Sequence, residues 1–145
     1  MRIVREVTGG RQFMGRLDCG SDLLDALTDI CREKGVQLGR LEVLGAVQKA
    51  RMGFYNQQTR AYEFYTIDSP LEILKVVGNI SLKDGQPMVH AHITLSDAEG
   101  KAFGGHLAPG TIVFASEYLI EELEGDPLER GFDEETGLPL WVDEA

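Results

Sequence analysis

The three histidines of this 145-residue chain, His90, His92 and His106, all lie within seventeen positions. Neutral imidazole is a common ligand of zinc and of other divalent transition metals. Three histidines on one ion leave the fourth position of a tetrahedral site open, as in catalytic zinc sites. An ion held in this way can bind a small-molecule ligand, polarise a carbonyl or lower the pKa of a bound water to about 7. The three side chains therefore predict a metal centre, with zinc as the expected ion.

The first two histidines belong to a segment with the alternation of a β-strand. In residues 88–95, His90, His92 and Thr94 share one parity, and apolar residues occupy the other. This period of two is typical of a strand with one buried face. His90 and His92 are therefore predicted to lie on the same, polar face.

The third histidine depends on how the next strand pairs with this one. The loop at 96–100 is rich in turn-forming residues, so we expect the two runs that it joins to be antiparallel neighbours. With this loop, His106 lies directly opposite His90, with Cβ atoms roughly 4.5–5.5 Å apart, and Gly104 lies opposite His92. A loop one residue shorter would place His106 on the other face, so the prediction depends on the register.

One helix is expected, at residues 22–34. Ser21 or Asp22 is a favourable N-cap, apolar residues follow at helical spacing, and Gly35 provides a stop. Because an apolar stripe of this kind has to be buried, we expect the helix to lie on a sheet.

Short alternating runs predict the strands of that sheet. Residues 3–17 indicate a strand pair or hairpin broken at residues 8–10, and Pro109-Gly110 suits a type II turn that would pair the strand of His106 with the strand after it. Further strands are expected at 41–47, 50–56, 61–67, 71–77, 78–82 and 111–123. The predicted fold is a single α+β domain in which an antiparallel β-sheet packs against one main helix.

Length and composition favour one ordinary domain outside the membrane. A chain of 145 residues can bury a hydrophobic core without the help of disulfides or structural metal ions. No apolar stretch is long enough for a membrane span or a signal peptide, so we expect a cytoplasmic protein without membrane contact. Cys19 and Cys31 are too few and too far apart for a redox or metal motif and are expected to be reduced thiols.

The formal charge of −10 is concentrated at the C-terminal end. From Glu121 onward there are ten acidic residues and one base, Arg130, which leaves the first 120 residues at −1. Nucleic-acid binders usually display a basic stripe that neutralises phosphates. Nucleic acid is therefore an unlikely partner.

The run HAHITLSD from His90, followed by GGHL and later by a glycine and a glutamate, resembles the PPC domain, the plants-and-prokaryotes conserved domain. The resemblance extends over about residues 10–123, so we divide the chain into a PPC-like domain at 1–123 and an acidic C-terminal segment at 124–145. The sequence ERGFDEETGLPLW in that segment resembles the ending of prokaryotic single-domain members. The resemblance implies a PPC-like α+β fold, a homotrimer, and a metal site at the three histidines.

The function that we favour is a metal- or ligand-binding module without turnover. An alternative is a small zinc-type metalloenzyme, a hydrolase or lyase, which would also need a positioned acid or base. Glu117, Glu72 and Arg51 are candidates, although an exposed strand charge or an ordinary ion pair is the more usual explanation for each. A further alternative is a DNA-binding protein like the plant AT-hook PPC proteins, which the charge and the missing Arg-Gly-Arg-Pro core disfavour.

Overall fold

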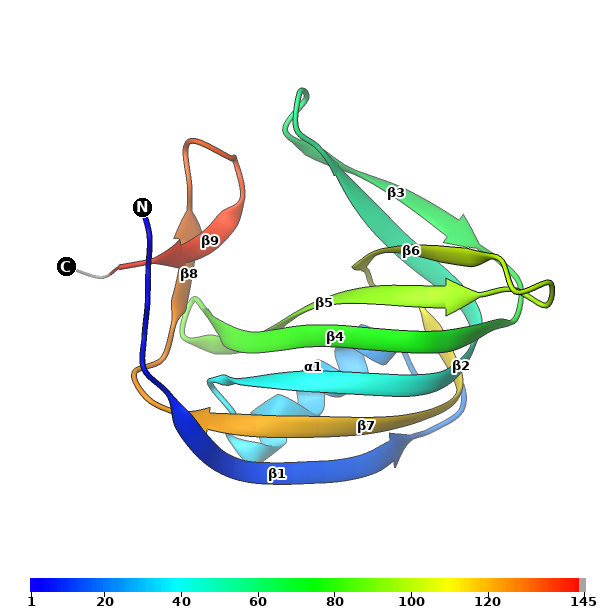
Figure 1. Cartoon of the computed structure of the whole chain (residues 1–145), viewed down its shortest axis with the longest axis horizontal. Helices are drawn as coiled ribbons and strands as arrows, with labels where there is room; N and C mark the ends of the chain where they lie inside the picture. Colours follow the sequence, from blue (N-terminus) through cyan, green and yellow to red (C-terminus); the bar gives the residue numbers. More distant parts are fainter. Residues whose placement is uncertain (144–145) are drawn as a thin grey trace.

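The structure is a computed structural model, and it describes residues 1–143. Within them, one helix and nine strands form a single domain (Figure 1). In chain order the elements are β1 (Thr8–Leu17), α1 (Leu23–Lys34), β2 (Gly39–Asn56), β3 (Ala61–Ile67), β4 (Leu71–Lys83), β5 (Gln86–Ser96), β6 (Ala102–Leu107), β7 (Ile112–Glu124), β8 (Glu129–Phe132) and β9 (Pro139–Val142). The predicted α+β class, with a largely antiparallel sheet and one main helix, is confirmed.

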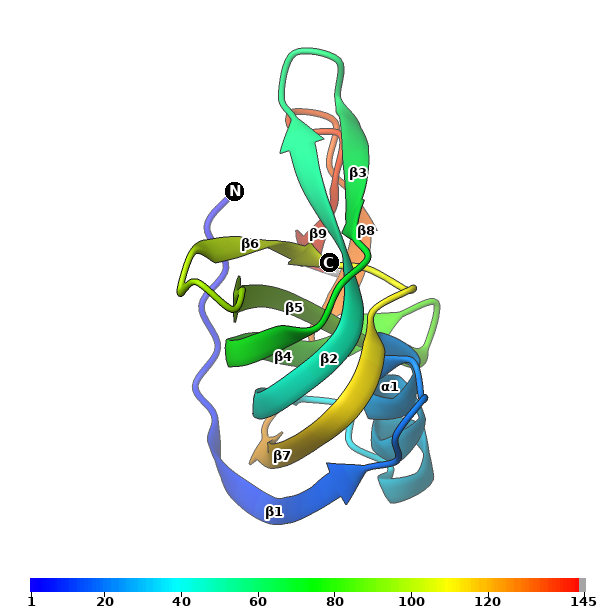
Figure 2. The same cartoon turned by 90° about the vertical axis from the view of Figure 1, so that its right-hand side faces the viewer.

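Helix α1 begins and ends where the sequence predicts. The Asp22 side chain accepts a hydrogen bond from the backbone N–H of Asp25, and Gly35 closes the helix with a left-handed φ of 68°. Leu23, Leu27 and Cys31 are fully buried against the sheet. The helix therefore covers one face of the sheet, as Figure 2 shows, and the core lies between them.

Strand β2 organises the sheet. Its first half pairs with β7 on one side and β4 on the other, and its second half pairs with β3 and, over two residues, with β6. Because β6 pairs with β5 and β5 with β4, the strands β2, β6, β5 and β4 close into a ring. The sequence predicts two strands each for β2 and β4, but each is continuous. Bulges bend β2 instead, and one of them lies at Gly45, whose φ of 137° favours glycine.

The N-terminal prediction was wrong in its pairing. Residues 1–7 form no strand, and residues 8–10 begin β1 rather than breaking a hairpin. β1 pairs with β7, about one hundred positions further along the chain, with an irregularity between Gly9 and Gln12. Pairing of β1 along the long edge of β7 is therefore favoured over the local hairpin turn that the two glycines predict.

The predicted pairing of β6 with β7 was also wrong. β7 pairs with β1 and β2 instead. At the joint, the Gly110 N–H donates to the Asp22 carboxylate at 2.6 Å, and the Thr111 hydroxyl accepts from the Arg51 N–H at 3.0 Å. These bonds direct the chain toward the start of α1 and away from a hairpin.

The acidic C-terminal segment contains two strands that its composition did not predict. β8 and β9 form an antiparallel pair, and β8 runs parallel to the end of β4, with Leu82 opposite Glu129. The segment therefore extends the same sheet. Among residues 1–143, no helix is long and apolar enough to cross a membrane.

Candidate metal centre

His90 and His92 lie on the face of β5 that turns away from the helix. Val89, Ala91, Ile93 and Leu95 are buried in the core, while His90 is half-buried and His92 is exposed. The predicted alternation is therefore present in the structure.

His106 lies on the same face, but its partner differs from the prediction. In the β5–β6 ladder His106 is directly opposite His92, not His90, and Gly104 is opposite Thr94, not His92. The loop is five residues long as expected but begins one residue later, at Asp97. Both strand ends shift together, so the parity, and with it the shared face, is preserved.

The Asp97 side chain explains the shifted loop. Its carboxylate accepts hydrogen bonds from the backbone N–H groups of Glu99 and Lys101, each at 2.9 Å, and its own N–H donates to the Lys101 carbonyl at 3.0 Å. Asp97 and Lys101 thereby close the loop between them. Strand pairing starts one step outside them, at Ser96 and Ala102.

The three imidazoles converge. The ring centroid of His90 lies 5.2 Å from that of His92 and 5.1 Å from that of His106, and the centroids of His92 and His106 are 5.7 Å apart. One ligand nitrogen from each ring lies within 4.8 Å of the other two. Nitrogens bound to one zinc at about 2.0–2.1 Å lie roughly 3.4 Å apart, so small side-chain rotations suffice to place all three on one ion.

Two side chains from distant strands complete this environment. The ring of Tyr62, on β3, lies 4.7 Å from that of His106. Gly53 pairs with His106 across β2 and β6, and a Cβ there would lie 3.1 Å from carbons of Tyr62 and Phe64. The glycine therefore leaves the space in which Tyr62 packs on the histidine. Burial raises the pKa of Tyr62, so its hydroxyl stays protonated at neutral pH.

The second side chain from a distant strand is Arg130, on β8. Its guanidinium donates to the Ser81 hydroxyl at 2.9 Å, to the Asn79 amide oxygen at 2.9 Å and to the Pro139 carbonyl at 3.1 Å. Asn79 is directly opposite His90 in the β4–β5 ladder. The guanidinium therefore lies beside the histidine cluster. No strand periodicity in the sequence assigns Arg130 to the site, although it is the one base among the ten acids from Glu121 onward.

The surroundings favour the neutral forms of His90 and His106. Burial lowers the pKa of His90 to about 4, assisted by the positive charge of Arg130 and by the other two histidines. Burial likewise lowers the pKa of His106, followed by the effects of His92 and Arg130. Neutral imidazole is the form that binds metal.

One nitrogen of the histidine cluster is buried without a hydrogen-bond partner in the described part of the chain, and a metal ion can provide the missing bond. The Nδ1 atom of His106 is buried and has no hydrogen-bond partner among residues 1–143. A buried polar atom without a partner costs about 1–3 kcal/mol, and bonding to a metal removes that cost. The residues present therefore fit a divalent ion.

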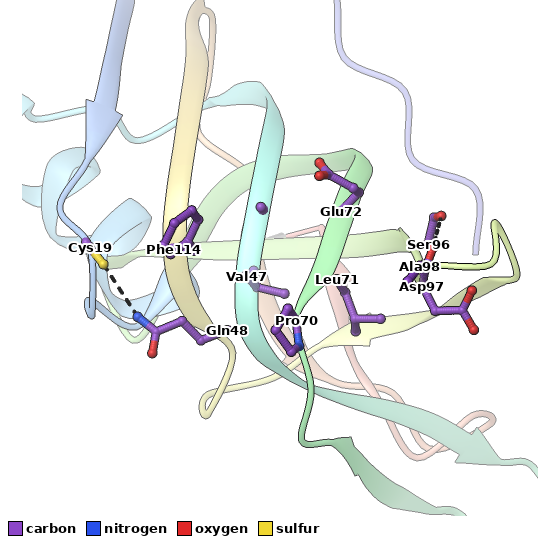
Figure 3. Close-up of a pocket in the computed structure, with 11 residues that line it drawn as sticks. Cys19, Val47, Gln48, Pro70, Leu71, Glu72, Ser96, Asp97, Ala98 and Phe114 are labelled. Atoms are coloured by element: carbon purple, nitrogen blue, oxygen red, sulfur yellow. Dashed lines mark hydrogen bonds between the residues drawn. The ribbon is translucent and has the colours of Figure 1, made fainter.

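The three acid or base candidates from the sequence do not join the cluster. Glu117 and Glu72 are outside the group of metal-ligating side chains formed by the histidines. Glu117 pairs with Leu44 and Arg16 on the β7 side of the sheet. Arg51 stacks on the Phe64 ring at 4.0 Å and donates to the Pro109 carbonyl. Glu72 lines a different groove, of about 700 Å³, between β2, β4 and β7 (Figure 3).

A family model for the Plants and Prokaryotes Conserved (PCC) domain matches residues 4–124. The chain belongs to this family, which confirms the resemblance seen in the sequence. Two solved structures share the fold over nearly the whole chain. A metal-containing protein from Archaeoglobus fulgidus is 39% identical with a TM-score of 0.93, covering 98% of this chain and 100% of that one. A plant- and prokaryote-conserved (PPC) protein from Pyrococcus horikoshii is 30% identical with a TM-score of 0.92, covering 99% of each chain.

A curated relative is much longer. The bifunctional protein GlmU of Synechococcus sp. (strain JA-3-3Ab) is 32% identical over 111 residues, which are 76% of this chain and 17% of that protein. The chain thus spans about a sixth of the length of the curated relatives that it matches. This likeness concerns the domain and carries no activity of the longer protein.

Proposed function

We propose that this PCC-domain chain is a metal-binding module in which His90, His92 and His106 hold one divalent ion and leave a coordination position for a small-molecule ligand. The observation that carries the proposal is the convergence of three imidazole nitrogens within 4.8 Å on one sheet face. The Archaeoglobus relative, a metal-containing protein with 39% identity, supports it. Zinc is the ion that we expect, because imidazole suits it. When bound, the ion supplies a Lewis-acidic centre for an oxygen ligand.

Metal analysis of protein without an affinity tag tests this proposal. Wild-type chain, stripped and then equilibrated with zinc, should retain about one ion per chain, as expected for a single three-histidine site. A His90→Ala variant should retain almost none, whereas a Thr94→Ala variant, altered on the same face, should match wild type. Equal retention by wild type and His90→Ala would contradict the proposal.

A small zinc-type metalloenzyme is the second candidate, favoured by the Tyr62 ring on His106. A protonated phenol beside a metal centre is a suitable proton donor. Hydrolysis of an activated ester such as 4-nitrophenyl acetate distinguishes the candidates. A zinc-dependent rate that falls in a Tyr62→Phe variant would favour the enzyme, and the absence of such a rate would favour the module.

We also propose that the chain assembles as a homotrimer, as the family resemblance implies. Support comes from large apolar side chains on the sheet face that the helix does not cover, where Met14 is 83% exposed and Phe114 is 61% exposed. Leu44, Leu74 and Val77 are also more than half exposed, and exposed apolar patches of this kind mark protein interfaces. Light scattering should give about three times the 16.0 kDa chain mass. The monomer mass at micromolar concentration would defeat this proposal.

Weak or no binding to duplex DNA remains our expectation, because the first 120 residues carry a formal charge of only −1. Salt-resistant, submicromolar binding to AT-rich DNA in an anisotropy titration would refute it. We retain the proposal of a cytoplasmic location, which is supported by the two free thiols, Cys19 and Cys31.

A further inference from the structure

A cavity of about 340 Å³ opens beside the histidine cluster. Its walls come from four distant parts of the chain: the N-terminal residues, β4, β5 and the β8–β9 pair. Its lining residues are Met1, Ile3, Asn79, His90, Arg130, Leu140 and Trp141. A hollow of this size suits a small ligand. Because His90 forms part of the wall, a molecule in the cavity lies next to the metal centre.

Of the side chains that the structure describes through residue 143, Arg130 is the one charged member of this wall. It is only 9% exposed, and its ring partner, Trp141, lies 5.4 Å from the guanidinium carbon. Buried arginines are ordinarily paired with carboxylates. Within residues 1–143, however, Arg130 forms no ion pair, and its three acceptors are an amide oxygen, a hydroxyl and a carbonyl, all neutral.

The guanidinium keeps unused donors. An arginine has five N–H groups, and three are engaged here, so Nη1 and Nη2 each retain one. A planar pair of N–H groups matches the two oxygens of a carboxylate. Among residues 1–143, no acidic residue lines the cavity, so none of them neutralises the positive charge of Arg130 there.

We propose that this cavity binds a small carboxylate, whose carboxyl group accepts hydrogen bonds from Arg130 beside the metal centre and whose short apolar part lies against Trp141 and Leu140. The inference rests on the proposed function, since it assigns a chemical class to the ligand of that module. A divalent ion held by three neutral imidazoles adds a second positive charge next to Arg130, which strengthens the preference for an anion. The apolar wall favours a carboxylate with a short hydrocarbon chain over a fully polar anion such as phosphate.

Trp141 provides the readout, because it is the one tryptophan of the sequence and lines the cavity. Zinc-loaded wild type is titrated with butyrate, with its neutral isostere butanamide, with butylammonium and with inorganic phosphate, and tryptophan fluorescence is followed. Butyrate should bind at least about tenfold more tightly than butanamide, because a charge-assisted hydrogen bond is lost in the amide. Phosphate binding equal to that of butyrate would overturn the carboxylate assignment, as would tighter binding of butylammonium.

Variants separate this inference from the proposed function. Arg130→Gln should weaken butyrate binding at least about tenfold, with zinc affinity weakened by no more than about threefold, since the variant removes a positive charge beside the ion. Arg32→Gln, an exposed change on α1, is the matched control and should alter neither. If zinc binds normally but Arg130→Gln leaves butyrate affinity unchanged, the inference fails alone. If wild type binds no zinc, the proposed function fails, and butyrate binding to the metal-free protein then tests Arg130 by itself.

Arg130 also fastens β8 to β4, so its substitution could disturb the fold. Trp141→Ala removes the apolar wall and leaves those hydrogen bonds in place. Followed by calorimetry, this variant should lose more affinity for butyrate than for acetate, because only butyrate has the longer chain. Equal losses for both anions would contradict the proposed position of the ligand.

Discussion

The two faces of β5 differ in how they are built. The face with Val89, Ala91, Ile93 and Leu95 is buried under the helix and in the core. The face with His90 and His92 is covered only in part, by side chains that arrive from β3, β6 and β8. One strand therefore supplies both buried core side chains and two of the three converging histidines, and the difference implies that changes on the two faces should have separable effects.

The largest effect should come from the core face. Ile93 is 1% exposed, and Ile93→Ala should lower the free energy of unfolding by about 2–5 kcal/mol through lost burial and a residual cavity. Urea denaturation of the metal-free protein measures this. Zinc affinity of the folded variant should stay within about threefold, and a loss below about 1 kcal/mol would contradict the assignment of this face to the core.

His92→Ala should show the opposite pattern. Removal of one of three ligands should lower zinc affinity by more than about a hundredfold, since loss of groups that merely orient ligands already costs 10–100-fold. Because His92 is exposed, unfolding of the metal-free variant should change by no more than about 0.5 kcal/mol. A chelator competition measures the first quantity and urea denaturation the second. Comparable losses in both would break the distinction between the faces.

The partial burial of the histidine face predicts a dependence on pH. Burial lowers the pKa of His90 to about 4 in the folded chain, whereas the pKa of histidine in an unfolded chain is about 6.5. Between these values the unfolded state binds more protons, so the free energy of unfolding of metal-free protein should fall as pH falls from about 6.5 to 4. After allowance for solvent exposure the loss is on the order of 1–2 kcal/mol. Denaturation series at several pH values should show a shallower slope for His90→Asn, and equal slopes would refute the prediction.

The smallest effect is expected for Thr94→Ala, the next position on the histidine face. Thr94 is exposed and lies opposite Gly104, outside the cluster. Unfolding free energy should change by less than about 0.5 kcal/mol and zinc affinity by less than about threefold. A larger loss of zinc would show that the site extends further along β5, which denaturation and chelator competition together would detect.

The sequence predicts what depends on local periodicity. The alternation in β5 places His90 and His92 on one face, and the caps Asp22 and Gly35 bound the helix, because each signal lies within a few residues of the element it defines. The face of His106 was predicted correctly, but its partner was not. The loop closure by Asp97 and Lys101 decides that partner, and the turn-forming residues between 96 and 101 do not specify which five of them make up the loop.

Local sequence signals do not predict which distant strands pair. β7 pairs with β2 rather than with β6, and this choice depends on strand edges that are far apart in the sequence. Arg130 reaches Asn79 across 51 positions of the chain, and nothing in the strand periodicity requires β8 to run beside β4. The signal that was present, a lone base followed by a tryptophan within an acidic segment, is chemical and not periodic. The place of Tyr62 in the site depends on the pairing of Gly53 with His106, because this glycine leaves room for the Tyr62 ring. The sequence alone does not indicate that pairing.

The ring of strands around β2 bears on the time course of folding. β3 is the partner of β2 that follows it directly in the sequence, so the β2–β3 hairpin closes over a short loop, whereas β4, β6 and β7 join across longer separations. Loop-closure entropy delays such distant pairings, and proteins dominated by them fold in milliseconds to seconds. His106 reaches its place only when β6 docks on β2. We therefore expect competence for metal to appear late in refolding, after most of the secondary structure has formed, so that a nascent chain passes through a long interval in which it holds no ion tightly.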